Sequence, residues 1–159
     1  MNNLIKHLTL FYIGFTSYIT IETLFRGYSY ALMGVIGAIC FILIDKINDY
    51  ISWDMDLLVQ SIIGSAIATL FELIFGLLLL RFDIRMWDYS NNWMNYKGVI
   101  CLKFSFLWIL LSMVAIVFAD CINYYILNSG DRPVYNVLKF IRVELPLKHR
   151  SCSEAINER

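Results

Sequence analysis

Four long apolar runs constrain the fold of this chain more than any other feature. They extend over residues 8–25, 28–44, 57–80 and 99–127. A helix of about 20 apolar residues crosses the hydrocarbon core of a bilayer. The runs therefore predict an all-α fold, a polytopic membrane protein with four transmembrane helices.

The composition also favours a lipid environment. Hydrophobic residues make up 59% of the chain and charged residues only 16%, whereas a soluble domain carries about a quarter charged residues. The mean hydropathy is +0.63. Because the formal net charge is zero, no overall charge favours binding to nucleic acid. We expect the lipid bilayer to surround the protein and expect no nucleic-acid partner.

The connections between the runs indicate how they pack. Only Arg26 and Gly27 separate the first two runs, so we expect these helices to form an antiparallel hairpin. The fourth run would extend about 44 Å as one helix, against a hydrocarbon core of about 30 Å. Its last part is therefore expected to emerge into the headgroups, with Asp120 and Asn123 solvated at the interface.

The C-terminal part of the chain has a different pattern. A helix over 134–145 would place apolar residues on one face and basic residues on the other, which predicts a short amphipathic helix on the membrane surface. We divide the chain into a four-helix transmembrane domain, 1–128, and an amphipathic surface segment with a polar tail, 129–159. The basic tail favours cytoplasmic termini. The apolar face would carry Val134, Val137, Leu138, Ile141 and Leu145, and the basic face Lys139 and Arg142.

Glu72 is the acidic residue that the sequence places deepest in a predicted span. It belongs to a stripe of residues four apart, in which small side chains allow a neighbouring helix to approach closely. An ionised carboxylate facing hydrocarbon is costly, so Glu72 should face the bundle interior, protonated or paired. It either contacts an ion, proton or substrate, or forms a buried bond that locks the helices together. The stripe consists of Gly64, Ala68, Glu72, Gly76 and Leu80.

Three further polar residues are candidates for the same site. Glu22 and Arg26 are four residues apart, which favours an ion pair at a helix end. Arg26 could instead reach Glu72 or Asp88. The segment 87–90, Trp-Asp-Tyr-Ser, either lines a vestibule or combines an aromatic belt with a turn. Glu22, Arg26, Glu72 and Asp88 would together form a polar centre.

The motifs of common enzymes and cofactor sites are missing from the sequence. There is no glycine-rich phosphate loop, no nucleophile motif and no set of ligands with zinc spacing. The four cysteines, Cys40, Cys101, Cys121 and Cys152, are interpreted as small packing residues. We expect no catalytic residue, metal or cofactor, and an enzyme is the least favoured interpretation.

Several motifs resemble a known family. The stretches TLFELIFG (69–76) and RMWDYSNNWMNYKGVICLKFSFLWILLSMVAI (85–116) resemble the putative ABC-transporter type IV family of small bacterial membrane proteins, which some small animal transmembrane proteins share. The resemblance extends over about residues 11–127. Its motif residues are Glu72, Gly76, Trp87, Asp88, Tyr89, Ser90, Gly98, Ile100, Cys101, Leu102, Phe104, Ser105, Phe106, Leu107 and Trp108, with Glu22, Arg26, Gly27, Tyr28 and Ser29 in the first hairpin and Trp53 and Asp54 between spans.

The resemblance implies a permease-like or transport-associated subunit in the bacterial inner (plasma) membrane. The chain has no ATPase domain, and four helices enclose little pore volume, so this role would require a homo-oligomer or a membrane partner protein. A structural or regulatory membrane protein is the alternative. In that case the polar cluster only fastens helices, and the Trp-Asp-Tyr-Ser loop docks a partner.

Overall fold

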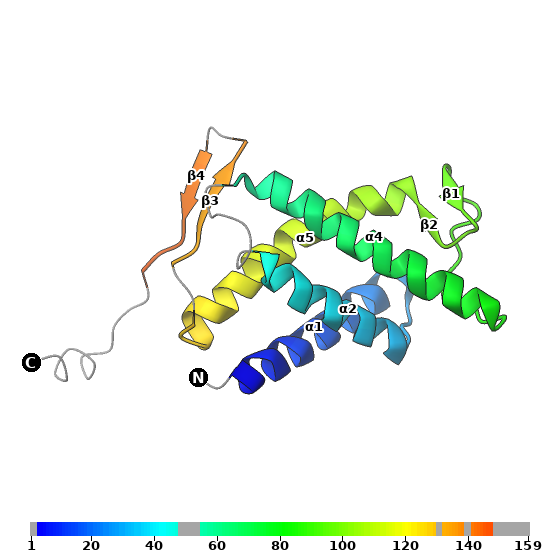
Figure 1. Ribbon diagram of the computed structural model, residues 1–159, viewed down its shortest axis with the longest axis horizontal. Coiled ribbons are helices and arrows are strands. Elements are labelled where there is room, and N and C mark those ends of the chain that lie inside the picture. The colour runs from blue at the N-terminus through cyan, green and yellow to red at the C-terminus, as the bar shows by residue number, and fades with distance from the viewer. Residues whose placement is uncertain (1–2, 48–54, 130–131, 139–140, 148–159) are drawn as a thin grey trace, which may run out of the picture.

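The computed structural model describes residues 3–47, 55–129, 132–138 and 141–147. Most of the structure is helical, with a small strand pair at each end of the long axis (Figure 1). The helices are α1 (Asn3–Arg26), α2 (Ala31–Asp45), α4 (Leu57–Arg81), α5 (Leu102–Cys121) and the π-helix η1 (Ile122–Ile126). The strands are β1 (Asn95–Tyr96), β2 (Ile100–Cys101), β3 (Val134–Val137) and β4 (Ile141–Glu144).

Three of the helical segments are long and apolar enough to cross a membrane. They are α1, α4 and the continuous helix formed by α5 and η1, with 24, 25 and 25 residues. The fourth apolar helix, α2, has only 15 residues and extends about 22 Å. It begins at Ala31, three residues after the predicted start, because Gly27 adopts a φ of 84° and Tyr30 has an extended backbone.

The predicted hairpin of the first two helices is confirmed, and glycines bring α1 and α2 together. A Cβ atom at Gly37 would lie 2.5 Å from the Tyr18 ring, and one at Gly14 would lie 2.9 Å from Cβ of Phe41. Between α4 and α5, a Cβ at Gly64 would lie 2.8 Å from Cβ of Ser112. Because α2 also contacts α4 and α5, the two helix pairs form one bundle (Figure 1).

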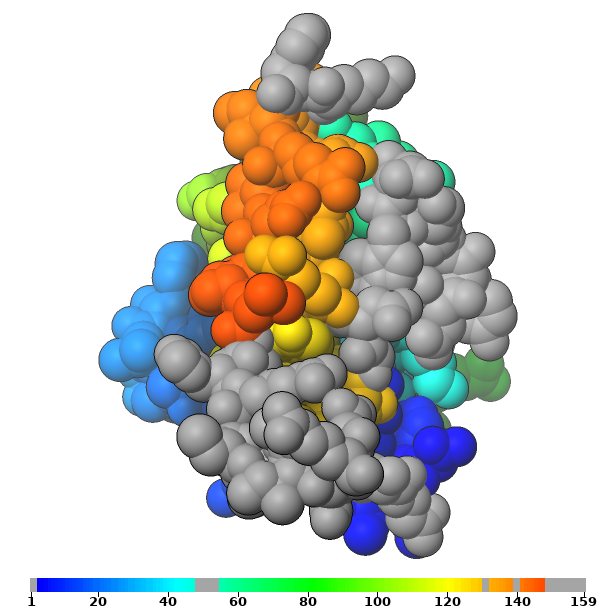
Figure 2. Space-filling model, turned by 90° about the vertical axis from the view of Figure 1, so that its left-hand side faces the viewer, coloured from blue at the N-terminus to red at the C-terminus, as the bar shows by residue number. Residues whose placement is uncertain are grey.

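The predicted amphipathic helix over 134–145 is wrong, because β3 and β4 form an antiparallel hairpin there, in which Tyr135 pairs with Val143. Pro133 precedes β3, and Leu138 adopts a left-handed φ of 52°, which a helix does not accommodate. Tyr135 is buried against residues of α2, α4 and α5, whereas its neighbours Val134 and Asn136 in β3 are half-buried, since adjacent residues of a strand point to opposite faces. Figure 2 shows the hairpin, in orange, over this end of the bundle.

The predicted solvation of Asp120 and Asn123 is also wrong, because both are buried. The Tyr135 hydroxyl donates a hydrogen bond to Asp120 over 2.7 Å. Asn123 donates to Asp45, which also lies 3.5 Å from the Lys6 ammonium. The β3–β4 hairpin supplies Tyr135 and covers this end of the bundle, which explains why these polar groups bond within the protein.

Candidate functional site

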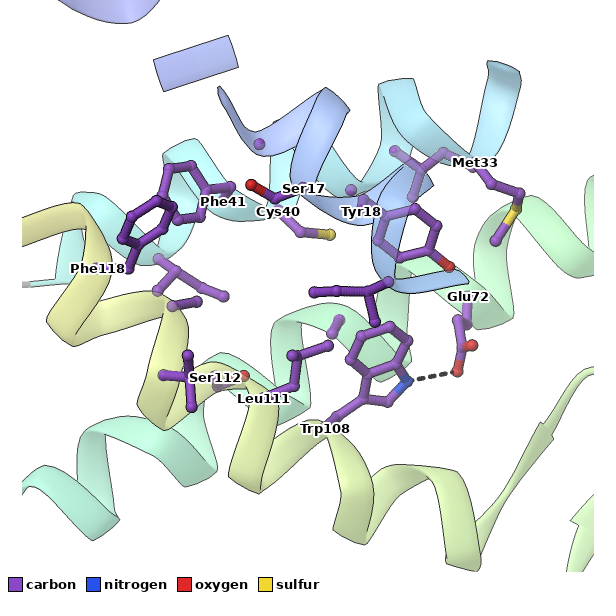
Figure 3. Close-up of a pocket in the computed structure, with 18 residues that line it drawn as sticks. Ser17, Tyr18, Met33, Cys40, Phe41, Glu72, Trp108, Leu111, Ser112 and Phe118 are labelled. Carbon is purple, nitrogen blue, oxygen red and sulfur yellow. Dashed lines mark hydrogen bonds between the residues drawn. The ribbon is translucent and has the colours of Figure 1, made fainter. Parts of the chain in front are cut away.

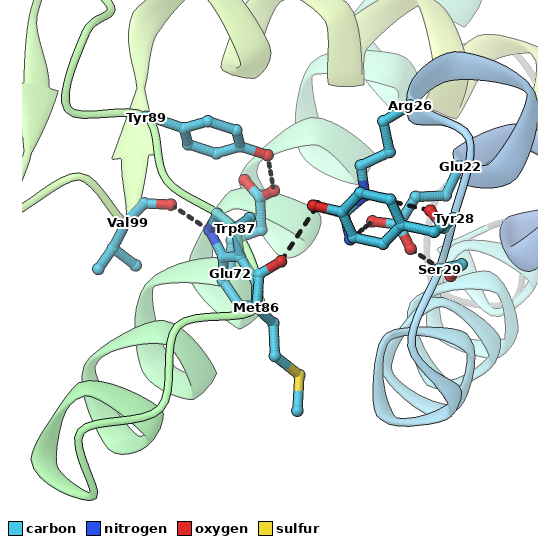
Figure 4. Close-up of polar contacts among 9 residues, drawn as sticks. All are labelled: Glu22, Arg26, Tyr28, Ser29, Glu72, Met86, Trp87, Tyr89 and Val99. Carbon is cyan, nitrogen blue, oxygen red and sulfur yellow. Dashed lines mark hydrogen bonds and ion pairs between the residues drawn. The ribbon is translucent and has the colours of Figure 1, made fainter.

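The carboxylate of Glu72 lies in the bundle interior with only 4% of the residue exposed. The Tyr89 hydroxyl donates to its Oε1 over 3.0 Å, and the Trp108 indole N–H donates to its Oε2 over 2.9 Å. Figure 3 shows the Trp108 bond and Figure 4 the Tyr89 bond. One acidic residue on α4 is therefore bonded both to α5 and to the loop that follows α4.

That loop, 82–94, lies against α4 because Gly76 has no side chain. A Cβ at Gly76 would lie 2.1 Å from Cγ1 of Val99 and 3.1 Å from Cζ2 of Trp87. The Trp87 indole N–H also donates to the Val99 carbonyl over 2.8 Å. Gly76, Trp87 and Val99 thus position the backbone from which Tyr89 reaches Glu72.

Asp88 shapes the turn beside Tyr89 and bonds to neighbouring residues of the loop. Its carboxylate accepts a 2.9 Å hydrogen bond from the Ser90 backbone N–H and pairs with Arg85 at 3.0 Å. The Ser90 bond is the main reason why the pKa of Asp88 is below its ordinary value, and Arg85 lowers this pKa further. With 47% of its side chain exposed, Asp88 acts here as a turn-forming residue.

Two nearby residues position Tyr89, one through its backbone and one through its ring. Gly98, at a φ of 69°, accepts the Tyr89 backbone N–H at 2.8 Å, and the Phe104 ring stacks on the Tyr89 ring at 4.3 Å. Burial, and secondly the Glu72 carboxylate, raise the pKa of Tyr89 above its usual range. The hydroxyl therefore remains a hydrogen-bond donor to Glu72.

Glu22 and Arg26 form the intrahelical ion pair that their spacing predicts, at 2.7 Å. Ser29 donates a further hydrogen bond to Glu22. Arg26 also donates to the carbonyl of Met86 over 3.1 Å, and its guanidinium lies 4.7 Å from the centre of the Tyr28 ring. The pair thus joins the α1–α2 turn to the loop after α4 (Figure 4).

Of the four predicted polar residues, three lie near one another and one does not. Tyr18 on α1 lies within electrostatic range of Glu22, Arg26 and Glu72, so these charges share one end of the bundle. Asp88 bonds instead to Arg85 and Ser90 on the exposed loop. Glu22, Arg26 and Glu72 therefore lie at one end of the bundle, and the Asp88 carboxylate is bonded within its own loop.

The remaining motif residues have structural contacts. Gly27 forms the α1–α2 turn, and Cys101 is buried at the start of α5. Ser105 accepts a 2.8 Å hydrogen bond through its carbonyl from Ser65, which joins α4 to α5. Trp53 and Asp54 lie outside the described residues.

An apolar cavity of about 120 Å³ lies between the four helices and ends at Glu72 (Figure 3). Tyr18 and Trp108 form its wall beside Glu72, with their rings stacked at 6.3 Å and 18°. Ile21 on α1 and Val114 and Phe118 on α5 also line the cavity. Because these three residues are 45–58% exposed, the cavity opens sideways on the outer surface of the helices.

The charge of Glu72 has no protein counter-ion in the part of the chain that the structure describes. The two donors to its carboxylate are neutral, and the nearby Arg26 pairs with Glu22. A carboxylate offers about four lone-pair positions, so the two bonds leave acceptor capacity free. Across the same described residues, no three His, Cys, Asp or Glu side chains are grouped as metal ligands.

Sequence reasoning did not identify Tyr18 or the contacts of a buried acidic set, Asp45 with Lys6 and Asp120 with Tyr135. Tyr18 lies one helical turn before Glu22, a spacing that could have associated the two. For the buried set, the available signal was the acidic end of the second apolar run, at Asp45. Its partners come from distant segments, so spacing within one element did not reveal them.

These features define a class of protein: a polytopic membrane protein with an interior carboxylate beside an apolar cavity. A family model described as "Putative ABC-transporter type IV" matches residues 8–145, and the chain belongs to that family. No curated protein and no solved structure matches the chain.

Proposed function

We propose that the protein is a permease-like, transport-associated subunit in which Glu72 contacts the transported species. The observation that carries this proposal is an interior carboxylate at the end of a cavity, bonded only to neutral donors among the described residues. Polar groups placed inside a membrane domain commonly mark ion or substrate pathways. Membership of a transporter-type family supports the same role.

The proposed arrangement places α2 in the membrane as a fourth, shorter helix beside the three long ones. It assigns the protein to the bacterial inner (plasma) membrane and gives it no enzymatic activity. Since the described part of one bundle encloses a cavity and not a continuous pore, we expect the protein to work as a homo-oligomer or with a membrane partner protein.

A structural or regulatory role is the second candidate, and one observation favours it. Both oxygens of Glu72 already accept hydrogen bonds from different elements, Tyr89 on the loop and Trp108 on α5. Hydrogen bonds to charged groups contribute about 1.5–3 kcal/mol each. Glu72 could thus fasten the loop and α5 to α4 without meeting any substrate.

Replacing Glu72 with glutamine in the native cell separates these two roles. The readouts are the amount of protein in the membrane and the accumulation of labelled solutes in three charge classes, organic cations, neutral compounds and organic anions. Asp83→Asn is the matched control, because it removes one exposed carboxylate at a left-handed residue with φ 56°, which asparagine tolerates.

The transport role predicts that E72Q reaches normal abundance but loses accumulation or export of at least one class, while D83N resembles the unmodified protein. If E72Q fails to reach the membrane, the fastening role is supported instead. Normal abundance together with normal transport of all three classes would remove Glu72 from the site.

A further inference from the structure

We infer that the cavity between the four helices binds a small organic ammonium ion, with its positive charge at Glu72 and its hydrocarbon part toward the lipid-facing opening. This inference rests on the proposed function and names the class of substrate. It is argued from the charge, the walls, the size and the opening of the cavity.

The charge balance at this end of the bundle favours a cation. Glu22 and Arg26 form a pair that is neutral as a whole, so an ionised Glu72 adds one negative charge without a protein counter-ion among the described residues. An unbalanced carboxylate in a low-dielectric interior is costly. The balancing charge has to come from a proton or from a bound cation.

The walls next to Glu72 select an organic cation over a metal ion. Hard metal ions require several oxygen ligands, and the cavity places only one carboxylate beside mostly apolar side chains. Tyr18 and Trp108 supply aromatic rings at the same place. Aromatic rings attract alkylammonium groups, because the ring face is negative and the cation is weakly hydrated.

The size and opening of the cavity limit the ligand. A volume of about 120 Å³ is close to that of an engineered protein cavity of about 150 Å³ that binds benzene. The exposed lining residues Ile21, Val114 and Phe118 form the lipid-facing opening, so a ligand that is dissolved in the membrane enters sideways. A ligand with a single aromatic ring and an ammonium group would place its charged end in the cavity and extend the rest of its hydrocarbon part through the opening.

The test uses phenyltrimethylammonium, whose positive charge does not depend on pH, and its neutral isostere tert-butylbenzene. The full chain is placed in nanodiscs of phosphatidylcholine, which has no net charge, and binding of the labelled cation is measured by equilibrium dialysis against empty nanodiscs. The variants are E72Q, V114W, which blocks the opening from an exposed position, and D83N as control. Thermal unfolding of each variant reports whether it is folded.

We expect the unmodified chain and D83N to bind the cation equally well. E72Q should bind it about tenfold more weakly or worse, since its charge is removed, and V114W should also lose binding. Tert-butylbenzene should compete at least tenfold less effectively than the unlabelled cation. Absence of binding above empty nanodiscs would overturn the inference, and so would equal competition by the neutral isostere or unchanged binding in folded E72Q.

The outcomes also separate this inference from the proposed function. If E72Q loses transport in cells but no cation binds, the transport role stands and the ammonium substrate is wrong. If the cation binds through Glu72 but no solute class depends on Glu72 in cells, the binding site stands and the transport role is wrong. If E72Q does not fold, V114W and the isostere competition still decide the inference.

Discussion

Replacing Gly76 with alanine tests whether close packing on α4 positions the loop that carries Tyr89. The new methyl group would lie 2.1 Å from Cγ1 of Val99 and 3.1 Å from Cζ2 of Trp87. Carbon atoms in contact are about 3.5–4.0 Å apart, so the overlap with Val99 exceeds about 1 Å. Val99 is buried, with 4% exposed, and its β-branched side chain has few rotamers available.

The expected magnitude follows from two opposing effects. Overpacking a well-packed interior costs about 1–3 kcal/mol, and the size of the overlap places this site in the upper part of that range. Exchanging glycine for alanine inside a helix returns about 1 kcal/mol. Gly76→Ala should therefore lower the free energy of unfolding by about 1–2 kcal/mol and displace Tyr89 from Glu72.

A double-mutant cycle with Val99→Ala identifies the cause. Val99→Ala removes the atom that the new methyl group meets, although alone it costs about 1–2 kcal/mol through the loss of buried methyl groups. The free energy of unfolding is measured for all four proteins by titration with a denaturing detergent. Because the overlap is then removed and the helix gain of about 1 kcal/mol remains, we expect Gly76→Ala no longer to destabilise the protein in the Val99→Ala background, and the double variant to be up to about 1 kcal/mol more stable than Val99→Ala alone.

Additive effects of the two substitutions would refute this reasoning. Independent sites are expected to have a coupling energy below about 0.3–0.5 kcal/mol. In that case Gly76 and Val99 do not constrain each other, and the position of Tyr89 has another origin.

Two further predictions concern the ends of the bundle. Tyr135→Phe removes the hydroxyl that donates a hydrogen bond to the buried Asp120. It should therefore destabilise the protein by about 1–3 kcal/mol and speed amide hydrogen exchange in β3 and β4. Unchanged exchange would contradict the role of this bond. The pKa of Asp88 in the folded protein is lowered from 3.8, so its stabilising effect is complete above that value and disappears as the pH falls through the folded pKa. The difference in thermal stability between the unmodified protein and Asp88→Asn should thus be constant between about pH 5 and pH 8. The difference should shrink below about pH 4. A difference that grows at low pH would contradict this.

Hydropathy predicted the helices well because burial in lipid depends on composition along a single segment. The predicted 57–80 run matches α4, Leu57–Arg81, to within one residue. The interior position of Glu72 also follows from the sequence, since a lipid-facing carboxylate is costly. Its bonds to Tyr89 and Trp108 did not follow, because the fold of the loop after α4 determines them.

The two wrong predictions at the other end of the bundle both involve the β3–β4 hairpin. Residues 134–145 contain apolar positions that suit either a helical or an alternating period, and short segments do not distinguish the two. The solvated position of Asp120 was predicted for a different reason, namely that the fourth run is longer than one span and its end was expected to leave the hydrocarbon core. The β3–β4 hairpin supplies a partner for Asp120 through Tyr135.

The motif residues around Glu72 have two distinct tasks. Tyr89 and Trp108 contact the carboxylate, whereas Gly76, Trp87 and Gly98 position the loop. Fastening α4 to α5 alone would require only the Trp108 bond. The added Tyr89 bond orients the second oxygen, yet both donors are neutral and leave the charge of Glu72 unbalanced. The Glu22–Arg26 pair, by contrast, balances itself, and this difference in charge supports the proposed role of Glu72 as the ligand contact.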